Sequence, residues 1–517
     1  MAGQKGGGGL LRSGVVVSAM TLVSRVLGMV RDMVIAAYFG SGLAADAFVI
    51  AFRIPNFLRR LFAEGAFAQA FVPVLSEYRS KRPLAEVQAL VNRTFGMLAL
   101  VLGLVTLVGV LAAPELAMLF APGFRDDPEK MALAGSLLRI TFPYLLLISL
   151  TAFTAGILNT YGQFGVPAFT PVLLNLCMIG ATVFLSPWFD QPVTALAWGV
   201  FIAGLAQLGF QLPWVARLGL LPRPEIRPRD DGVRRILWLM VPALLGVSVS
   251  QINLLLDTVL ASFLQSGSVA WLYYADRLSE LPLGAFGIAI GTVILPSLSR
   301  LHAGEDHQSF AATLDWALRM VLLVGIPAAL ALGVLATPLI AGLFFYGAMT
   351  ERAVQQSAAA LEAYALGVLA FMLVKVLAPG FYARQDMKTP VRIAITCMLA
   401  NMAFNLMLVW PLQHVGLALA TSLSSLLNAF LLFWGLYRTG VFRPEPGWGQ
   451  FLLRLAGGCL AMLGAVLWLN VPDRQWFAWD WAQRAWHLAL LVGAGVLAFA
   501  ASLWLLGLRG RHLRHPG

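Results

Sequence analysis

The chain has 517 residues, of which 59% are hydrophobic and 12% are charged, and its formal net charge is +11. Soluble domains carry about 25% charged residues, so this composition excludes an ordinary soluble protein and indicates an all-α polytopic membrane protein. The basic excess does not indicate nucleic acid, because the basic residues gather in the segments between apolar runs.

Fourteen apolar runs can serve as transmembrane helices, each of which needs roughly 20 apolar residues. The basic, glycine-rich N-terminus resembles a signal peptide. Its apolar run continues into Arg25 without a small-residue cleavage site, so we interpret it as a retained first helix. The second run is the least apolar, and the alternation of loop charge requires it. The runs are 14–39, 44–76, 90–113, 134–159, 166–187, 193–216, 236–264, 271–298, 312–345, 357–382, 391–411, 415–437, 451–470 and 485–508.

The first run carries charge at the depth of the bilayer. Arg25 and Asp32 share one helical stripe, and Arg31 lies about 100° from Asp32 on an ideal helix. A cation at this depth costs several kcal/mol, so it is expected to face a protected cavity with something to bind. A guanidinium group matches phosphate oxygens bidentately, which favours a phosphate-containing ligand for Arg25 and Arg31.

The second run carries the densest set of charges. Arg59 points away from the main stripe on an ideal helix, but Pro55 is expected to kink the segment. We favour ligand contact for Arg59, whereas internal pairing and ligand contact both stay open for the acids and the other arginines. The polar residues on or beside the stripe are Asp46, Arg53, Asn56, Arg60 and Glu64.

Later runs contain fewer charged residues. Asp257 is a lone carboxylate in the seventh run, either a paired or protonated core residue or a ligand for a coupling ion. In the eighth run Arg277 stands between Asp276 and Glu280, and we favour ligand contact for it. Asp386, near the base of the eleventh run, is a second candidate for the coupling ion.

Loop charge predicts the orientation of the chain. With a cytoplasmic N-terminus, 20 Lys and Arg residues fall on the inside and 5, Lys130 among them, fall on the outside. Positive residues accumulate in cytoplasmic loops, so both termini are predicted to be cytoplasmic.

An internal repeat divides the chain. Residues 65–67 (GAF) recur at 284–286, and 171–172 (PV) recur at 390–391, both with an offset of 219 positions. This offset corresponds to six helices and therefore to a parallel repeat, in which the substrate binds between the halves. We predict an N-terminal lobe (1–218), a basic cytoplasmic linker (219–235), a C-terminal lobe (236–440), and two extra helices with a basic tail (441–517).

Several motifs resemble the MurJ/MviN family of lipid II flippases. The longest is PNFLRRLFAEGAF in the second run. The matches reach from the first helix to at least the twelfth, and they include residues 24–28 (SRVLG), 31–32 (RD), 45–48 (ADAF), 55–67, 273–278 (YYADRL) and 377–386 (LAPGFYARQD).

The resemblance implies a fold of the multidrug/oligosaccharidyl-lipid/polysaccharide exporter type. Two six-helix lobes form a V, and two extra helices help to form a groove for a polyprenyl tail. Some members bind sodium through a seventh-helix acid, whose position Asp257 matches, although Tyr382 near the partner segment departs from that site. The substrate-binding positions implied by the family motifs are Ser24, Arg25, Arg31, Asp46, Asn56, Arg59, Glu64 and Arg277.

We therefore predict a flippase, not an enzyme. It would move lipid II, the undecaprenyl-pyrophosphate-linked peptidoglycan precursor, to the periplasmic leaflet of the bacterial inner membrane by alternating access. The four arginines would hold the pyrophosphate and bridge the lobes. No P-loop or catalytic set occurs, so no cofactor is expected, and a Na⁺ or H⁺ gradient or the membrane potential would drive transport. Membrane lipids and the cell-wall synthesis machinery are the expected partners.

Four alternatives stay open at this stage. They are a flippase for another polyprenyl-pyrophosphate-linked glycan, a cation-coupled drug exporter of the same fold, a glycosyltransferase that polymerises lipid II, and a non-transporting scaffold. The glycosyltransferase is disfavoured because the short outside loops hold no evident catalytic carboxylate, and a scaffold would not need buried arginines.

Overall fold

The computed structural model describes residues 7–60, 67–284 and 288–509, and within these ranges the secondary structure consists of helices joined by turns and loops, with no strand. The prediction of an all-α protein is therefore confirmed. The chain divides into two compact units, Met1–Val269 and Ala270–Gly517.

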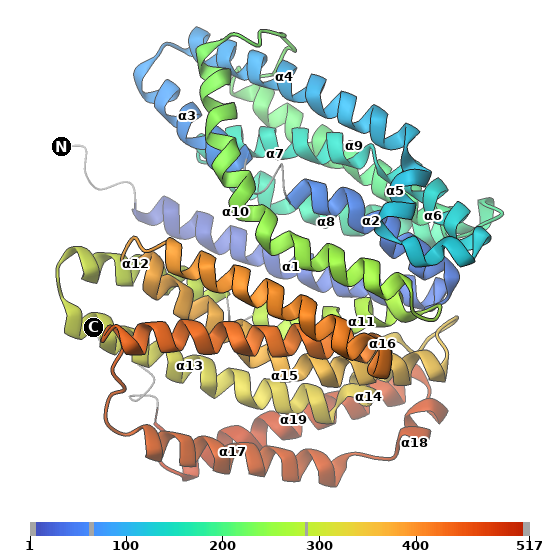
Figure 1. The fold of residues 1–517 in the computed structure, drawn as a ribbon, viewed down its shortest axis with the longest axis vertical. Helices are drawn as coiled ribbons and strands as arrows, with labels where there is room; N and C mark the ends of the chain where they lie inside the picture. The colour runs from blue at the N-terminus through green and yellow to red at the C-terminus, as the bar shows by residue number, and fades with distance from the viewer. Residues whose placement is uncertain (1–6, 61–66, 285–287, 510–517) are drawn as a thin grey trace. The chain divides into compact units, whose positions relative to one another are not determined.

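The first unit is a bundle of long helices. Helix α1 packs against α8, α2 against α6, and α7 against α3, α4 and α9 (Figure 1). Its core contains Phe67, Phe71 and Phe153, whose ring centroids lie 4.8–6.0 Å apart. The helices are α1 (Gly7–Phe39), α2 (Leu43–Arg59), α3 (Ala68–Lys81), α4 (Leu84–Leu111), α5 (Ala113–Phe120), α6 (Pro128–Thr141), α7 (Tyr144–Thr160), α8 (Gly165–Gly180), α9 (Thr194–Arg217) and α10 (Asp231–Ser262).

The basic linker between α9 and α10 is fastened to α4. The backbone N–H of Glu225 donates to the carbonyl of Asn92 (3.2 Å), and that of Arg223 donates to the Asn92 side chain (2.9 Å). A Cβ atom on Gly96 would lie 2.4 Å from the Glu225 carbonyl oxygen, so only glycine lets the linker approach this closely. The linker is thus an ordered strap along α4.

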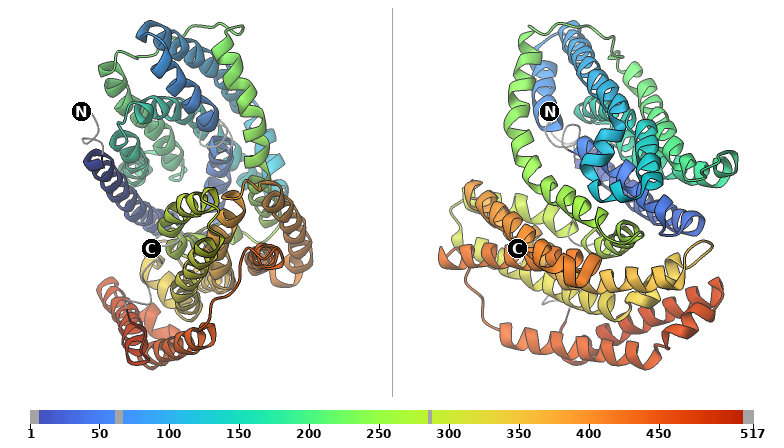
Figure 2. Two further views of the ribbon diagram at one scale, coloured as in Figure 1. Left: turned by 90° about the vertical axis from the view of Figure 1, so that its left-hand side faces the viewer. Right: turned by 45° about the vertical axis from the view of Figure 1, so that its right-hand side comes forward.

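The second unit contains the remaining helices. Helix α15 packs against α13 and α16, and α17 lies beside α19 at one edge of this unit (Figure 2). The helices are α11 (Ser268–Pro282), α12 (Ile288–Ala303), α13 (His307–Val334), α14 (Ala336–Phe344), α15 (Glu351–Tyr382), α16 (Lys388–Arg438), α17 (Trp448–Leu469), α18 (Asp473–Ala478) and α19 (Trp481–Leu505).

Helix α16 is a hairpin of two helices. Gln413, two residues after Pro411, has non-helical angles (φ 51°, ψ −132°). The Asn401 side chain donates to Ser424 Oγ (3.3 Å). These two residues lie almost equally far from Gln413 in opposite directions along the chain, so the halves must run antiparallel. The two halves correspond to the predicted spans 391–411 and 415–437.

A polar cluster joins the extra helix α17 to α13. Asp315 forms an ion pair with Arg319 (2.7 Å) and accepts hydrogen bonds from the Trp448 indole (2.6 Å) and the Glu445 backbone (3.2 Å). The Arg319 guanidinium also lies over the Trp448 ring. Because Asp315 is buried, these bonds fix where α17 begins.

The predicted spans agree with the observed helices. In the described ranges, ten helices are long and apolar enough to cross a membrane, and the hairpin α16 is counted once among them. Interrupted segments, such as α2 with α3 and α11 with α12, cover other predicted spans, so fourteen crossings are compatible with the structure. The division into compact units places α10 in the first unit, whereas the internal repeat in the sequence assigns it to the C-terminal lobe. The repeat-based boundaries remain a prediction.

Candidate functional site

Arg25 lies near the middle of the 26-residue apolar stretch Gly14–Phe39 of α1. Its side chain is partly exposed and makes no hydrogen bond or ion pair within the described ranges. An unpaired guanidinium at this depth is costly unless a ligand or water-filled cavity receives it. Arg25 is thus available to bind an anion.

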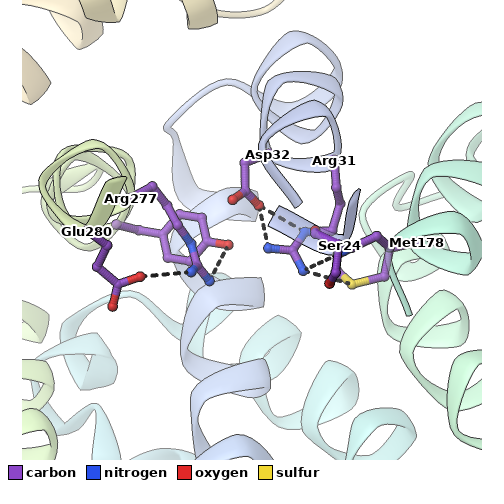
Figure 3. A network of polar contacts seen from close by, with 8 residues as sticks. Ser24, Arg31, Asp32, Met178, Arg277 and Glu280 are labelled. Carbon is purple, nitrogen blue, oxygen red and sulfur yellow. Dashed lines mark hydrogen bonds and ion pairs between the residues drawn. The ribbon is translucent and has the colours of Figure 1, made fainter. Parts of the chain in front are cut away.

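Arg31, unlike Arg25, is buried and paired (Figure 3). It is 5% exposed, and its Nε and Nη2 donate to one carboxylate oxygen of Asp32 at 2.9 and 2.7 Å. Its Nη1 donates to the Asn175 side chain (3.1 Å) on α8. The Asn175 amide in turn donates to the backbone carbonyl of Ser24 (2.9 Å). Arg31 is therefore paired internally with Asp32 and Asn175, and its predicted contact with a phosphate stays a prediction.

Arg59 and Asn56 stand together at the end of α2. The Arg59 Nε donates to Asn56 Oδ1 (2.9 Å), and both residues line a pocket of about 500 Å³ inside the first unit. Helices α2, α3, α7, α8 and α9 form its walls. Among the described residues Arg59 is the one charged member of its lining, and the other polar lining residues are Tyr144, Thr151, Asn159, Thr170, Gln207 and Gln211.

Two glutamines of α9 line this pocket, and they differ in how their side chains are hydrogen-bonded. Gln211 accepts from the Thr154 hydroxyl (2.6 Å) and donates to the Thr170 hydroxyl (2.9 Å). Gln207 donates to the Thr170 carbonyl (3.1 Å), but its Oε1 accepts no hydrogen bond from the described residues. Gln207 therefore has an unused acceptor, within the described residues, in a pocket that carries other amide and hydroxyl groups.

Asp46 is occupied by partners from its own unit. It is 1% exposed and forms an ion pair with Lys130 of α6 (2.7 Å). It also accepts from the backbone N–H of Gly267 (2.7 Å), in the loop just before the second unit begins. Lys130, which the loop count placed outside, is buried over the face of Phe124. These contacts give Asp46 a structural role, and its proposed contact with substrate stays a prediction.

Arg53 of the second run contacts α10, the helix that also carries Asp257. Arg53 donates to the Thr258 hydroxyl of α10 (2.7 Å), next to Asp257 in the chain. Asp257 is partly buried, and its function as an ion ligand stays a prediction. Glu64 lies outside the described residues.

Arg277 belongs to α11 of the second unit. Its guanidinium lies over the Tyr273 ring, 5.0 Å from the centroid, and approaches Glu280 (3.4 Å; Figure 3). Both groups are partly exposed, so this ion pair is weak. An anion of higher charge can displace the glutamate from Arg277.

Asp386 lies in the turn before α16. It accepts from the backbone N–H of Thr389 (3.0 Å), and hydrogen bonds from the Thr389 side chain and backbone lower the pKa of Asp386. The contact is typical of a residue that caps a helix N-terminus. Its role as an ion ligand stays a prediction.

Comparison with known proteins identifies the family. A family model described as "Lipid II flippase MurJ" matches residues 35–484. The chain belongs to the MurJ family. It is 51% identical to a "Probable lipid II flippase MurJ" of Vibrio cholerae, over 98% of both chains. It is 42% identical to a "Lipid II flippase MurJ" of Burkholderia cenocepacia, over 98% of this chain and 99% of the relative.

Solved structures agree with MurJ membership. "Lipid II flippase MurJ, inward closed conformation" matches with a TM-score of 0.80 and 27% identity, over 95% of this chain and 98% of that one. An inward-facing multidrug transporter of the MATE family, from the MOP superfamily, matches with a TM-score of 0.68 over 83% of this chain and 98% of that one. At 15% identity, this second match shows the fold alone. A MurJ-family chain is a multi-pass transporter and not an enzyme, which excludes the glycosyltransferase.

Sequence reasoning missed the distant partners of Arg31 and Asp46. Asn175 is 144 positions from Arg31, and Lys130 is 84 positions from Asp46. The sequence does mark out Asn175, because it is a polar residue inside the apolar run 166–187. The sequence does not mark out Lys130, because it follows the charged stretch 125–129 and resembles a solvated loop residue.

Proposed function

We propose that this chain moves lipid II from the cytoplasmic to the periplasmic leaflet of the bacterial inner membrane by alternating access, with arginines binding its pyrophosphate. The observation that carries the proposal is the guanidinium of Arg25, which lies in the apolar stretch of α1 and has no hydrogen-bond or ion-pair partner among the described residues. Insertion scales put a central arginine at about 2.5–3.5 kcal/mol. A pyrophosphate offers this group a doubly charged partner with matching geometry.

Arg59 and Arg31 would act differently. Arg59 lines a roomy polar pocket, so a phosphate can reach it without disrupting packing. Arg31 already has Asp32 and Asn175, so a phosphate must compete with the Asp32 carboxylate. We propose that Arg31 holds the phosphate at a later stage than Arg25 does. Ser24 and Asn56 would position these arginines, because each is bonded to a member of the set or to its partner.

We propose that Arg277 also binds the pyrophosphate, and different observations support this. Its exposed ion pair with Glu280 is weak enough to exchange, and the Tyr273 ring fixes the plane of the guanidinium. Glu64 and Asp46 stay as proposed acidic residues of the substrate path, the first from the family motif alone.

The membrane potential is the proposed driving force. Each negative charge that moves outward across 100 mV gains about 2.3 kcal/mol when the cytoplasm is negative. A pyrophosphate headgroup is an anion, so the potential favours its export. Coupling to Na⁺ or H⁺ through Asp257 is the alternative. Both termini are proposed to be cytoplasmic, as the loop charges indicate.

The proposal is tested by replacing the native copy in cells. Arg25→Ala, Arg59→Ala and Arg277→Ala should each fail to support growth and should leave labelled lipid II in the inner leaflet. Arg25→Lys should retain part of the activity if charge suffices and little if the bidentate fork is required. Arg139→Ala is the matched control, because Arg139 is an exposed arginine of α6 without a partner in the described ranges.

The outcomes separate the rival readings. If all three alanine variants are expressed normally and sustain growth, the arginine clamp is wrong. If depletion leaves lipid II equally distributed between leaflets while another polyprenyl-linked glycan accumulates inside, the substrate assignment is wrong. A change in growth that Arg139→Ala shares would reflect membrane insertion and would also count against the clamp.

A further inference from the structure

The pocket beside Arg59 has a composition that the pyrophosphate does not explain. It measures about 500 Å³, within the range of about 300–1,000 Å³ typical of ligand sites. Its lining residues on α7 run from Tyr144 to Asn159, a rise of about 22 Å. Arg59 is the one charged residue that the described part of the chain contributes to this lining, and the other described lining residues are neutral, with amide and hydroxyl groups among apolar residues.

Three polar groups in the pocket have unused hydrogen-bonding capacity within the described ranges. They are the Oε1 of Gln207, the amide of Asn159 and the NH₂ group of Asn56. Gln207 is 2% exposed, and a buried acceptor without a donor typically costs about 1–3 kcal/mol. Together they offer both donors and acceptors but no negative charge, which suits a neutral, hydroxyl- and amide-bearing ligand.

We infer that this pocket binds the sugar attached directly to the pyrophosphate of the substrate. The inference rests on the proposed function, because it takes a phosphate at Arg59 as its starting point. The sugar is joined to that phosphate through a single oxygen, so a phosphate at Arg59 brings the sugar to the adjoining pocket. Its N-acetyl group supplies an amide N–H for the Gln207 acceptor, and its hydroxyl and carbonyl oxygens accept from Asn56 and Asn159.

The stem peptide fits this pocket less well. A peptide ending in a carboxylate would need a cation to bind it, and Arg59, the one guanidinium among the described lining residues, is assigned to the phosphate. Ala152 and Ala155 of α7 leave space along one wall. Both side chains are partly exposed, so larger residues there would project into the pocket.

The test measures binding to the purified full-length protein in nanodiscs. The probes are undecaprenyl pyrophosphate, which has no sugar, and undecaprenyl-pyrophosphate-linked N-acetylmuramic acid whose carboxyl group is capped as a methylamide in place of the peptide, so that the sugar stays neutral. Gln207→Leu should weaken binding of the sugar-bearing lipid roughly three- to tenfold, as expected for one lost hydrogen bond, and leave the sugar-free lipid unchanged. Ala155→Leu should give the same split by filling the pocket.

Gln163→Leu is the matched control. Gln163 also has a buried, unpartnered Oε1 within the described ranges, but it does not line the pocket. The Gln163→Leu variant should bind both lipids as tightly as the parent protein does. Thermal unfolding and binding of the sugar-free lipid verify that each variant is folded.

Each remaining result has a defined meaning. If Gln207→Leu and Ala155→Leu bind both lipids normally, the pocket does not hold the sugar and the inference is overturned. A loss seen with a peptide-bearing lipid but not with the peptide-free one overturns it in favour of the stem peptide. The proposed function fails separately if Arg25→Ala and Arg59→Ala bind the sugar-free pyrophosphate lipid as tightly as the parent does.

Discussion

The buried pair of Asp46 and Lys130 allows a test that separates a structural role from substrate binding. Their charged atoms lie 2.7 Å apart, with side-chain exposures of 1% and 5%. The Coulomb attraction is about 6 kcal/mol at an effective dielectric constant of 20, and desolvation offsets much of it. Removing one partner should nevertheless cost about 3–5 kcal/mol, because the other charge stays buried.

The experiment is a double-mutant cycle with Lys130→Met, Asp46→Asn and the combined variant. In Lys130→Met the carboxylate loses its cationic partner, while the Gly267 N–H still donates to it. Each single variant should lower the Tm in detergent by on the order of 10 °C, at about 2–4 °C per kcal/mol. The combined variant should recover most of this loss, because it buries no unpaired charge.

Growth complementation supplies the second readout. If Asp46 acts through Lys130, the combined variant should recover activity along with stability. If Asp46 contacts substrate, the combined variant should be stable yet inactive. Additive losses of Tm, with a coupling below about 0.5 kcal/mol, would refute the reasoning that the two charges depend on one another.

Three further predictions concern parts outside the proposed binding site. Gly96→Ala should destabilise the protein by about 1–3 kcal/mol and speed tryptic cleavage of the linker, since the new Cβ would overlap the strap backbone; an unchanged cleavage rate would contradict this. Asp315→Ala should lower the Tm markedly by leaving Arg319 without its carboxylate partner, whereas Asp315→Asn should cost less. Asp386→Ala should lower the Tm at pH 7. The Asp386 pKa lies below its ordinary value of 3.8 when folded, so its stabilisation is present above that value and lost as pH falls through the folded pKa. A Tm difference that persists in stronger acid would exclude the capping charge as its source.

The helices were largely predictable because the bilayer imposes a simple rule on sequence. A span must satisfy its own backbone and present apolar side chains over a fixed length, and both requirements are visible in a window of about 20 residues. Even the least apolar run, 44–76, matches α2 and α3 where these are described. The turn at Gln413 was found because a short break between two apolar runs forces a hairpin.

The partners of the charged residues were not predictable in the same way. Arg25 and Arg31 are six residues apart in one apolar helix and look equivalent by hydropathy. Arg31 pairs with the adjacent Asp32 and with Asn175, which α8 brings beside α1. The lining of the Arg59 pocket likewise combines five helices, and no local pattern predicts which polar residues will meet. Long-range packing decides these contacts.

This difference between Arg25 and Arg31 limits how a phosphate can bind. A free guanidinium at mid-membrane depth gains the full attraction of an arriving anion, whereas a paired one gains just the difference between the anion and its existing carboxylate. Arg25 should therefore dominate the initial capture of substrate. Arg31 can contribute where the protein conformation weakens its bond to Asp32. A ligand shifts a conformational equilibrium only by its differential affinity for the two states. An arginine that exchanges Asp32 for phosphate in one state supplies such a difference, and one that is free in both states supplies little.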